Sequence, residues 1–234
     1  RDDVESRGLG DVYKRQMLNS IGQMGITEDV IFLNIHNSGS NFCGIKEILV
    51  ADTIPVLLGI YYALDKEKTY ILLRYKTREK YNNSQIRIII VMAAIFSAVR
   101  QIVDYIFTVY SFNGATIKKY PFVLYSLMEL VVIWIFFVAT GLFYKILRDC
   151  LQNELIALIG AFGVNFVQFI LIKFWLVKFW IPGLDVAAAY DFLEGNKSPV
   201  SCLGILAKNI VMAIVLYIAG IVTFAKRDIL RNEK

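Results

Sequence analysis

The sequence predicts an all-α protein, a polytopic bundle of transmembrane helices with five spans present of an expected six. Of its 234 residues, 57% are hydrophobic and only 19% are charged, against about 25% charged in ordinary soluble domains. The apolar residues gather in long runs, and the charged residues gather between the runs. A helix needs roughly 20 apolar residues to cross a bilayer. Backbone polar groups in lipid must bond within their own segment, so each run is expected to be a helix.

Five apolar runs define the expected spans. The first is the shortest and contains Asp52 and Pro55, so it also fits a re-entrant or interfacial segment. The other four are longer and read as full spans. The runs cover residues 48–64, 88–110, 121–144, 155–180 and 203–224.

The connections between the runs predict the orientation. Thirteen lysines and arginines fall in the loop 65–87, in the short turn after the third run, which holds Lys145 and Arg148, and in the tail 225–234. Only four fall on the opposite side. Basic loops stay in the cytoplasm, so the chain is expected to be a multi-pass plasma-membrane protein with a cytoplasmic C-terminus.

The N-terminal region is expected to be incomplete. Residues 1–16 resemble a translated sequencing-adapter read-through, so they are excluded as a non-native artefact. An odd number of spans with the C-terminus inside then implies a lost sixth span. Residues 17–47 would form an outer loop after it, and the Asn, Ser and Gly residues at 34 and 37–41 suit a loop.

Cysteine and histidine content argues against metal and disulfide chemistry. Cys43, Cys150 and Cys202 contain no CxxC pair. Cys43 and Cys202 fall on the same predicted side, which leaves a bridge between them open. The single histidine, His36, excludes a multi-histidine metal site. No cofactor and no metal are expected.

Six ionisable residues fall inside the expected spans, where charge is costly and is usually paired or directed toward a cavity. Arg100 and Asp104 are spaced for pairing along one helix. Arg100 and Glu129 fall at similar depths on adjacent antiparallel spans. The group forms either a polar path or gate, or structural ion pairs with the lysines reaching outward. Its members are Asp52, Arg100, Asp104, Glu129, Lys173 and Lys208.

Polar and small residues on the fourth and fifth runs predict helix contacts. Asn165 and Gln168 could join helices by hydrogen bonds. Gly160, Gly163, Gly204 and Gly220 would allow close approach. After the fourth run, residues 187–193 fit a short outer helix.

The loop 65–87 fits a short basic amphipathic helix over residues 70–81. It could lie on anionic headgroups or dock on a cytoplasmic motor subunit. Its R-Y-x-x-R-x-K pattern follows a proline-containing span and precedes another span. The residues expected to carry the docking are Leu73, Arg74, Tyr75, Arg78 and Lys80.

This layout over residues 45–225 resembles the membrane subunits (permeases) of bacterial type-2 ATP-binding-cassette transporters. It is most similar to permeases of Gram-positive bacteriocin or lantibiotic export and self-immunity systems. The resemblance implies a dimer of permeases, either identical or different, and a separate ATPase subunit that touches the loop 65–87. It implies movement of a substrate, a peptide or a lipid-like molecule, across the membrane. The family's first span has no counterpart here.

Other functions fit less well or remain open. The sequence contains no GxxxxGK[ST] phosphate loop, so another chain would hydrolyse the ATP. An intramembrane CAAX-type protease needs paired histidines and glutamates, but the runs hold no histidine and one glutamate. No enzyme and no nucleic-acid partner are therefore expected. A membrane anchor or sensor subunit without transport activity remains the alternative.

Overall fold

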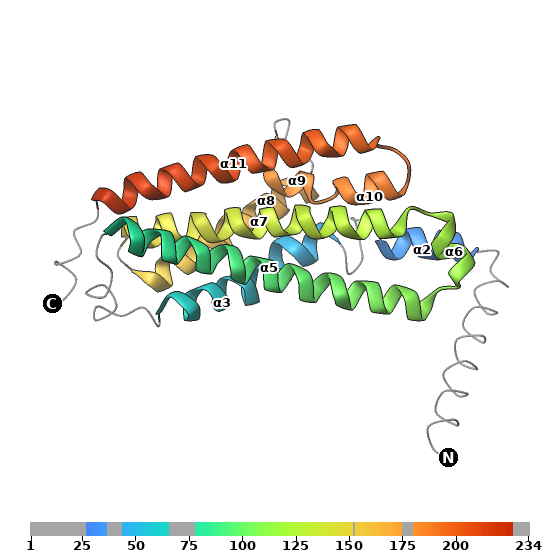
Figure 1. Cartoon of the computed structure of the whole chain (residues 1–234), viewed down its shortest axis with the longest axis horizontal. Helices are drawn as coiled ribbons and strands as arrows, with labels where there is room; N and C mark the ends of the chain where they lie inside the picture. The colour runs from blue at the N-terminus through green and yellow to red at the C-terminus, as the bar shows by residue number, and fades with distance from the viewer. Residues whose placement is uncertain (1–26, 37–43, 66–77, 152, 175–179, 227–234) are drawn as a thin grey trace, which may run out of the picture.

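A computed structural model describes residues 27–36, 44–65, 78–151, 153–174 and 180–226. The elements in these ranges are helices, which confirms the predicted all-α fold (Figure 1). In chain order they are α2 (Glu28–His36), the π-helix η1 (Glu47–Asp52), α3 (Thr53–Asp65), α5 (Arg78–Ser111), α6 (Gly114–Lys119), α7 (Phe122–Leu151), α8 (Glu154–Lys173), α9 (Pro182–Asp185), α10 (Ala188–Leu193) and α11 (Pro199–Lys226).

Five helical segments are long and apolar enough to cross a membrane, and each coincides with one predicted run. Their outer faces carry exposed aliphatic side chains, for example Val211 at 60% and Val215 at 58%. Such continuous apolar faces are covered by lipid or by another apolar surface. The chain is a multi-pass membrane protein. The segments are Glu47–Leu64, Glu79–Ser111, Phe122–Leu151, Glu154–Lys173 and Pro199–Ala225.

The helix ends differ from the apolar runs. Helix α5 begins ten residues before the run at 88–110, and α8 ends at Lys173 rather than at Trp180. Early polar residues of α5 bury against neighbouring helices, Gln85 completely. Hydropathy marks only the part of a helix that suits lipid, whereas the hydrogen-bonded helix continues as long as its side chains find partners.

The predicted turn after the third span is wrong, because Lys145 and Arg148 lie within α7 and are buried. Lys145 Nζ donates to Asp149 Oδ2 at 2.7 Å, one helical turn away. The same nitrogen lies 4.8 Å from the centre of the Phe224 ring on α11. A paired cation over an aromatic face can be buried at low cost, so α7 extends beyond its apolar run.

Helix α7 is the central element of the bundle. It contacts α5, α8 and α11, and it also touches α3 and α10. In Figure 1 it runs between α11 and α5 along the length of the molecule. One hydrophobic core lies where α7 meets α3 and α5, around Ile60, Ile89 and Phe137. Functional residues on α7 can therefore meet side chains from several helices.

A second core closes the end of the bundle formed by α2, α6 and α10, as Figure 1 shows. The predicted outer loop 17–47 is wrong for residues 28–36, which form α2. Glu28 accepts from the backbone N–H of Asn113 at 2.7 Å, just before α6. At the other end of α6, Asp29 pairs with Lys119 and raises the pKa of that ammonium group. The predicted short outer helix is present as α10.

The first span is helical but contains a widened π turn, η1, immediately before α3. Pro55 follows this turn closely, and a proline ring clashes with the carbonyl four residues before it. The Thr53 hydroxyl bonds to the Ile48 carbonyl at 3.0 Å, five residues back. Widened turns of this kind are frequent at functional sites. Here the turn ends at Asp52, one of the predicted intramembrane charges.

Candidate functional site

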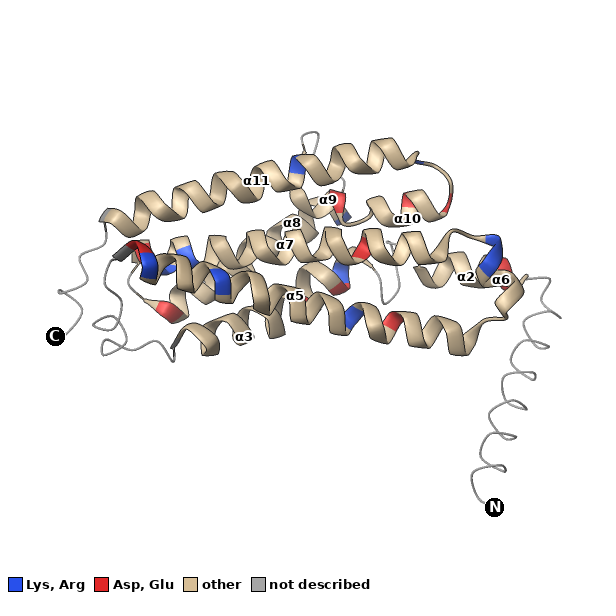
Figure 2. Ribbon diagram, viewed as in Figure 1, with Lys and Arg blue, Asp and Glu red and all other residues tan. Residues whose placement is uncertain are grey.

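Four of the six predicted intramembrane charges are brought together in a cluster around Arg100. The Arg100 Nε donates to Asp52 Oδ2 at 2.7 Å, and its Nη1 donates to Glu129 Oε1 at 3.2 Å. The three residues come from α5, η1 and α7, so the guanidinium joins three separate segments. Figure 2 shows a few charged positions along α5 and α7 between the two ends of the bundle. The predicted proximity of Arg100 and Glu129 is confirmed.

Asp104 extends the cluster by one turn along α5 and meets a residue that sequence reasoning did not select. The His36 Nε2 lies 4.0 Å from Asp104 Oδ2 and 3.1 Å from the Thr108 hydroxyl. The His36 Nδ1 is 2.7 Å from the Phe32 carbonyl. The imidazole is completely buried. These contacts fix its orientation and bring α2 against the Asp104 end of the cluster. We call Asp52, Arg100, Asp104, Glu129 and His36 the charged cluster.

The charged cluster contains more acidic than basic groups. Three carboxyl groups face one guanidinium and one imidazole. The side chains of Arg100 and Glu129 are only 7% and 4% exposed, whereas that of Asp52 is 32% exposed. Burying unbalanced charge is expensive in lipid. Such an excess is rarely retained for stability alone, and it makes this cluster the candidate functional site.

A small opening connects the charged cluster with the outer face of the bundle. A pocket of about 190 Å³ has Asp52 and Arg100 on one wall and Phe96, Val99 and Val103 among its other lining residues. Val99 and Val103 are 56% and 50% exposed, so the pocket borders the lipid-facing surface. The acidic end of the cluster is therefore accessible from the side of the molecule.

The two remaining predicted charges lie elsewhere. Lys208 on α11 donates to Asp185 Oδ1 at 2.9 Å and lies 4.6 Å from the centre of the Trp180 ring. Lys173, at the end of α8, lies 5.7 Å from the centre of the Phe169 ring. Both lysines have partners of their own, and neither joins the charged cluster. This arrangement fits the structural alternative for the lysines.

Sequence reasoning missed two partners of the predicted charges, His36 beside Asp104 and Asp185 beside Lys208. His36 was assigned to a loop because Asn, Ser and Gly follow it, although the acidic pair Glu28 and Asp29 before an apolar stretch is a helix start signal. Asp185 also bonds to Asn209 Nδ2 at 3.0 Å and to Trp180 Nε1 at 2.7 Å. No local pattern distinguishes this aspartate, because its partners come together only through the fold.

Three of the five predicted coupling residues lie in a segment that the structure does not describe. Leu73, Arg74 and Tyr75 lie outside the described residues. Arg78 is the first residue of α5, and Lys80 is exposed on its first turn. This end of α5 lies at the same end of the molecule as the last turns of α7 and α11 in Figure 1.

A separate polar contact joins α8 to its neighbours, as predicted for Asn165 and Gln168. The Asn165 Nδ2 donates to Thr53 Oγ1 at 3.2 Å and to Thr140 Oγ1 at 3.1 Å. Gln168 Nε2 donates to Asn165 Oδ1 at 3.2 Å, and Gln168 Oε1 accepts from the backbone N–H of Gly183 at 3.0 Å. We call these side chains the amide network.

Comparisons with known proteins add no family assignment. No protein-family model, no curated protein and no solved structure matches the chain. Within the ranges that the structure describes, no group of three or more His, Cys, Asp or Glu side chains is placed to hold a metal ion. The features that bear on function are therefore the charged cluster and the layout of the spans.

Proposed function

We propose that this chain is the permease subunit of a bacterial ATP-binding-cassette transporter of type 2, driven by a separate ATPase subunit. The observation that carries the proposal is the charged cluster, in which Arg100 is bound by acids from two other segments. Intramembrane charges facing a bundle interior commonly mark substrate or ion pathways. The pocket beside Asp52 gives a substrate access to this charge from the flank of the bundle.

The link to an ATPase comes from the sequence pattern around Arg74, Tyr75, Arg78 and Lys80. In the permeases that the layout resembles, the corresponding basic segment touches the ATPase. Under the proposed orientation this segment lies in the cytoplasm, together with the ends of α7 and α11. A basic surface there would attract an acidic face of a partner protein. The proposed complex contains two permease chains and the ATPase subunits.

A co-purification experiment tests the ATPase partner. The chain would be tagged and expressed with the ATPase encoded beside its gene, then purified in mild detergent. We expect the double reversal Arg74→Glu with Arg78→Glu to reduce the recovered ATPase at least about tenfold, because two buried or rim charge pairs would become repulsive. The matched control is Lys46→Glu with Lys118→Glu, which reverses two exposed charges on the predicted outer side and should leave recovery unchanged.

Unchanged recovery after the Arg74 and Arg78 reversals would contradict the coupling role. Failure of any neighbouring ATPase to co-purify with the unaltered chain would instead favour the membrane anchor or sensor.

A further inference from the structure

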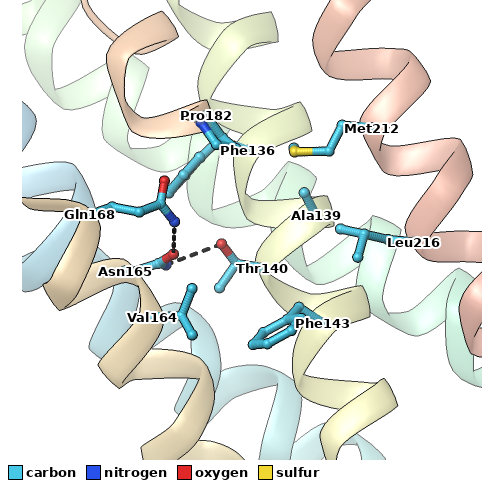
Figure 3. Close-up of a pocket in the computed structure, with 10 residues that line it drawn as sticks. All are labelled: Phe136, Ala139, Thr140, Phe143, Val164, Asn165, Gln168, Pro182, Met212 and Leu216. Atoms are coloured by element: carbon cyan, nitrogen blue, oxygen red, sulfur yellow. Dashed lines mark hydrogen bonds between the residues drawn. The ribbon is translucent and has the colours of Figure 1, made fainter. Parts of the chain in front are cut away.

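A cavity of about 300 Å³ lies between α7, α8 and α11 and shares no lining residue with the opening at Asp52. Figure 3 shows Met212 and Leu216 reaching toward it from α11, opposite Gln168 on α8, with Thr140 of α7 between them. Pro182 of α9 lies at one end. A cavity of this size is near the lower end of the range for small-molecule sites.

The walls of this cavity are apolar, while one side carries the amide network. Phe136, Phe143, Met212 and Leu216 supply aromatic and aliphatic surface, and Thr140 and Gln168 supply polar groups. No acidic or basic side chain is among its lining residues in the described part of the chain. An ionic ligand would lose its hydration here without a counter-charge, so the lining favours a neutral molecule.

The amide network leaves hydrogen-bond donors available toward the cavity. Gln168 uses one Nε2 proton for Asn165 and its Oε1 for Gly183. A primary amide has two such protons, so one has no partner among the residues that the structure describes. The Thr140 oxygen accepts from Asn165, which leaves its hydroxyl proton to donate. The strongest complement of these groups is a hydrogen-bond acceptor such as a carbonyl oxygen.

The route into the cavity leads from the lipid. Val164 is one of its lining residues and is 43% exposed, so the cavity opens onto the outer surface between α8 and α11. Asn165 lies about 16 Å along an α8 helix that is about 30 Å long, by 1.5 Å per residue. The polar side of the cavity is thus near the middle of a span, away from both aqueous phases.

We propose that this cavity binds a small, neutral, lipid-soluble molecule with an apolar body and one carbonyl acceptor, oriented by Gln168 and Thr140. Hydrocarbon alone fits poorly, because it would cover the two donors without bonding to them. Water alone also fits poorly, because the aromatic and aliphatic walls offer it no bonds. The proposal concerns this cavity only, and it does not depend on an ATPase or on transport.

Benzophenone is a suitable probe because it is neutral, apolar and a ketone. Under near-ultraviolet light its excited oxygen takes a hydrogen atom from a nearby C–H group, and the two carbon radicals then join. The adduct therefore contains every atom of both partners, and mass spectrometry locates it. The carbons beside the Met212 sulfur are the expected position. The purified full-length chain in lipid nanodiscs would be illuminated with increasing benzophenone, and saturable labelling at Met212 is expected.

Competition tests the acceptor without altering the protein. Phenyl benzoate has a carbonyl, whereas diphenylmethane has a similar shape and none. We expect phenyl benzoate to reduce the Met212 adduct at least about fivefold more than diphenylmethane does, the difference that one hydrogen bond of about 1 kcal/mol provides. A second, almost wholly apolar cavity of about 310 Å³, lined by Trp134 and Ile214 among others, is the internal control. There the two competitors should act equally.

Two variants complete the test. Gln168→Leu removes the donor, and Leu216→Trp fills the cavity, so each should reduce the Met212 adduct at least about fivefold. Val215→Trp is the control for Leu216→Trp, because Val215 is a neighbouring α11 residue that faces outward. Equal competition by both compounds at Met212, or labelling that persists in Leu216→Trp, would overturn the proposal. Labelling lost in Leu216→Trp but unchanged in Gln168→Leu would also overturn it, since it would show binding to the apolar walls alone.

Discussion

Arg100 is the residue whose loss is expected to lower the stability of the bundle interior most. It contacts Asp52 and Glu129 directly and lies one helical turn from Asp104. Removing its guanidinium would leave carboxylates in a medium of low polarity with no opposite charge of comparable strength. Breaking a buried pair in this way costs about 3–5 kcal/mol, more than the pair itself contributes. Arg100 therefore governs both stability and the charge of the candidate site.

We expect Arg100→Met to lower the free energy of unfolding by about 3–5 kcal/mol, measured by denaturant or thermal unfolding in detergent micelles. The free energy of unfolding of Arg100→Lys should lie between those of Arg100→Met and the unaltered protein, because an ammonium keeps the charge but not the planar arrangement of donors. Arg87→Met is the matched control, since Arg87 lies on the same helix and is exposed. Equal melting of the Arg100 and Arg87 variants would show that the cluster does not stabilise the fold.

Removing the acids together with the arginine separates charge from packing. The triple variant Arg100→Met, Asp52→Asn, Glu129→Gln should recover about half or more of the stability lost in Arg100→Met, because it leaves no unbalanced charge. Unfolding of the single and triple variants under the same conditions measures the recovery. A triple variant less stable than Arg100→Met would mean that the acids have stabilising partners other than Arg100.

Close approach of helices involves two of the four expected glycines, Gly160 and Gly220, and also Gly141, which was not expected. A methyl group on Gly141 would lie 2.5 Å from Ile89 and 2.8 Å from Ile60, because α3, α5 and α7 meet there. The predicted contact glycines Gly163 and Gly204 face open space instead, whereas a methyl group on Gly160 would lie 3.0 Å from Leu147. Spacing along one helix cannot reveal which face another helix covers.

We expect Gly141→Ala to destabilise the protein by about 1–3 kcal/mol through overpacking. Gly163→Ala, in an unobstructed helical position, should instead be neutral or stabilise it by up to about 1 kcal/mol. Thermal unfolding of both variants in the same detergent checks the difference. A Gly141→Ala protein as stable as the Gly163→Ala protein would show that the three helices do not pack as closely as described.

At the scale of elements, α8 is attached to the bundle by polar bonds as much as by packing. Much of its surface faces outward, but Asn165 donates to Thr53, the first residue of α3, and to Thr140 on α7. Gln168 then holds Gly183 of α9. Hydrogen bonds between membrane helices are individually modest, about 0.6 kcal/mol on average and up to about 1.7. Several together are enough to fix the position of a helix.

We expect Asn165→Leu to reduce stability by about 1–2 kcal/mol, because two interhelical bonds are lost. Phe166→Leu, a neighbouring outward-facing position, should change it by less than about 0.5 kcal/mol. Unfolding in detergent measures both, and proteolysis between α7 and α8 reports whether α8 detaches. An Asn165→Leu protein that unfolds like the Phe166→Leu protein would contradict the role of the amide network.

The positions of the five spans were predictable from the sequence, but the ends of their helices were not. Hydropathy located all five because a lipid-facing surface must be apolar along its whole length. It placed the start of α5 too late and the end of α7 too early, because residues such as Gln85 and Lys145 continue a helix by forming hydrogen bonds beyond the apolar run. It placed the end of α8 too late, at Trp180 instead of Lys173. The widened turn at η1 was not predictable, although Pro55 indicated an irregularity nearby.

The candidate site was predictable only for residues whose depth in the membrane was enough to bring them together. Arg100 and Glu129 lie on adjacent spans at matching depths, which was enough to place them together. The contribution of Asp52 depends on how η1 turns its side chain, and that of His36 depends on α2 folding back over the bundle. Distant segments of this kind leave no periodic signal in the chain.

At the scale of the whole molecule, two exposed positions at opposite ends of the bundle can report its orientation in the membrane. Cys150 is exposed near the end of α7, and Gly195 is exposed in the connection between α10 and α11. In the proposed orientation Cys150 is cytoplasmic. We expect a membrane-impermeant maleimide to label Cys150 in inverted vesicles but not in intact cells, in a chain where Cys43 and Cys202 are replaced by alanine.

The reverse pattern is expected for Gly195→Cys in a chain without its natural cysteines. This position has a backbone φ of 83°, so some local strain is expected, and Asn196→Cys in the same exposed turn is an equivalent reporter. Labelling of Cys150 from outside intact cells would invert the orientation and remove the basis for a cytoplasmic ATPase contact.

The aromatic cap formed by Phe32, Phe112, Phe122 and Tyr125 has a consequence for the proposed transport. Phe32 meets Phe112 edge to face with a centroid separation of 5.2 Å, and Phe122 stacks on Tyr125 with a centroid separation of 5.9 Å. A molecule that moved lengthwise through the inside of a single copy would have to separate these packed rings. Passage along the lipid-facing flank, or along a seam shared by two copies, leaves the aromatic cap intact.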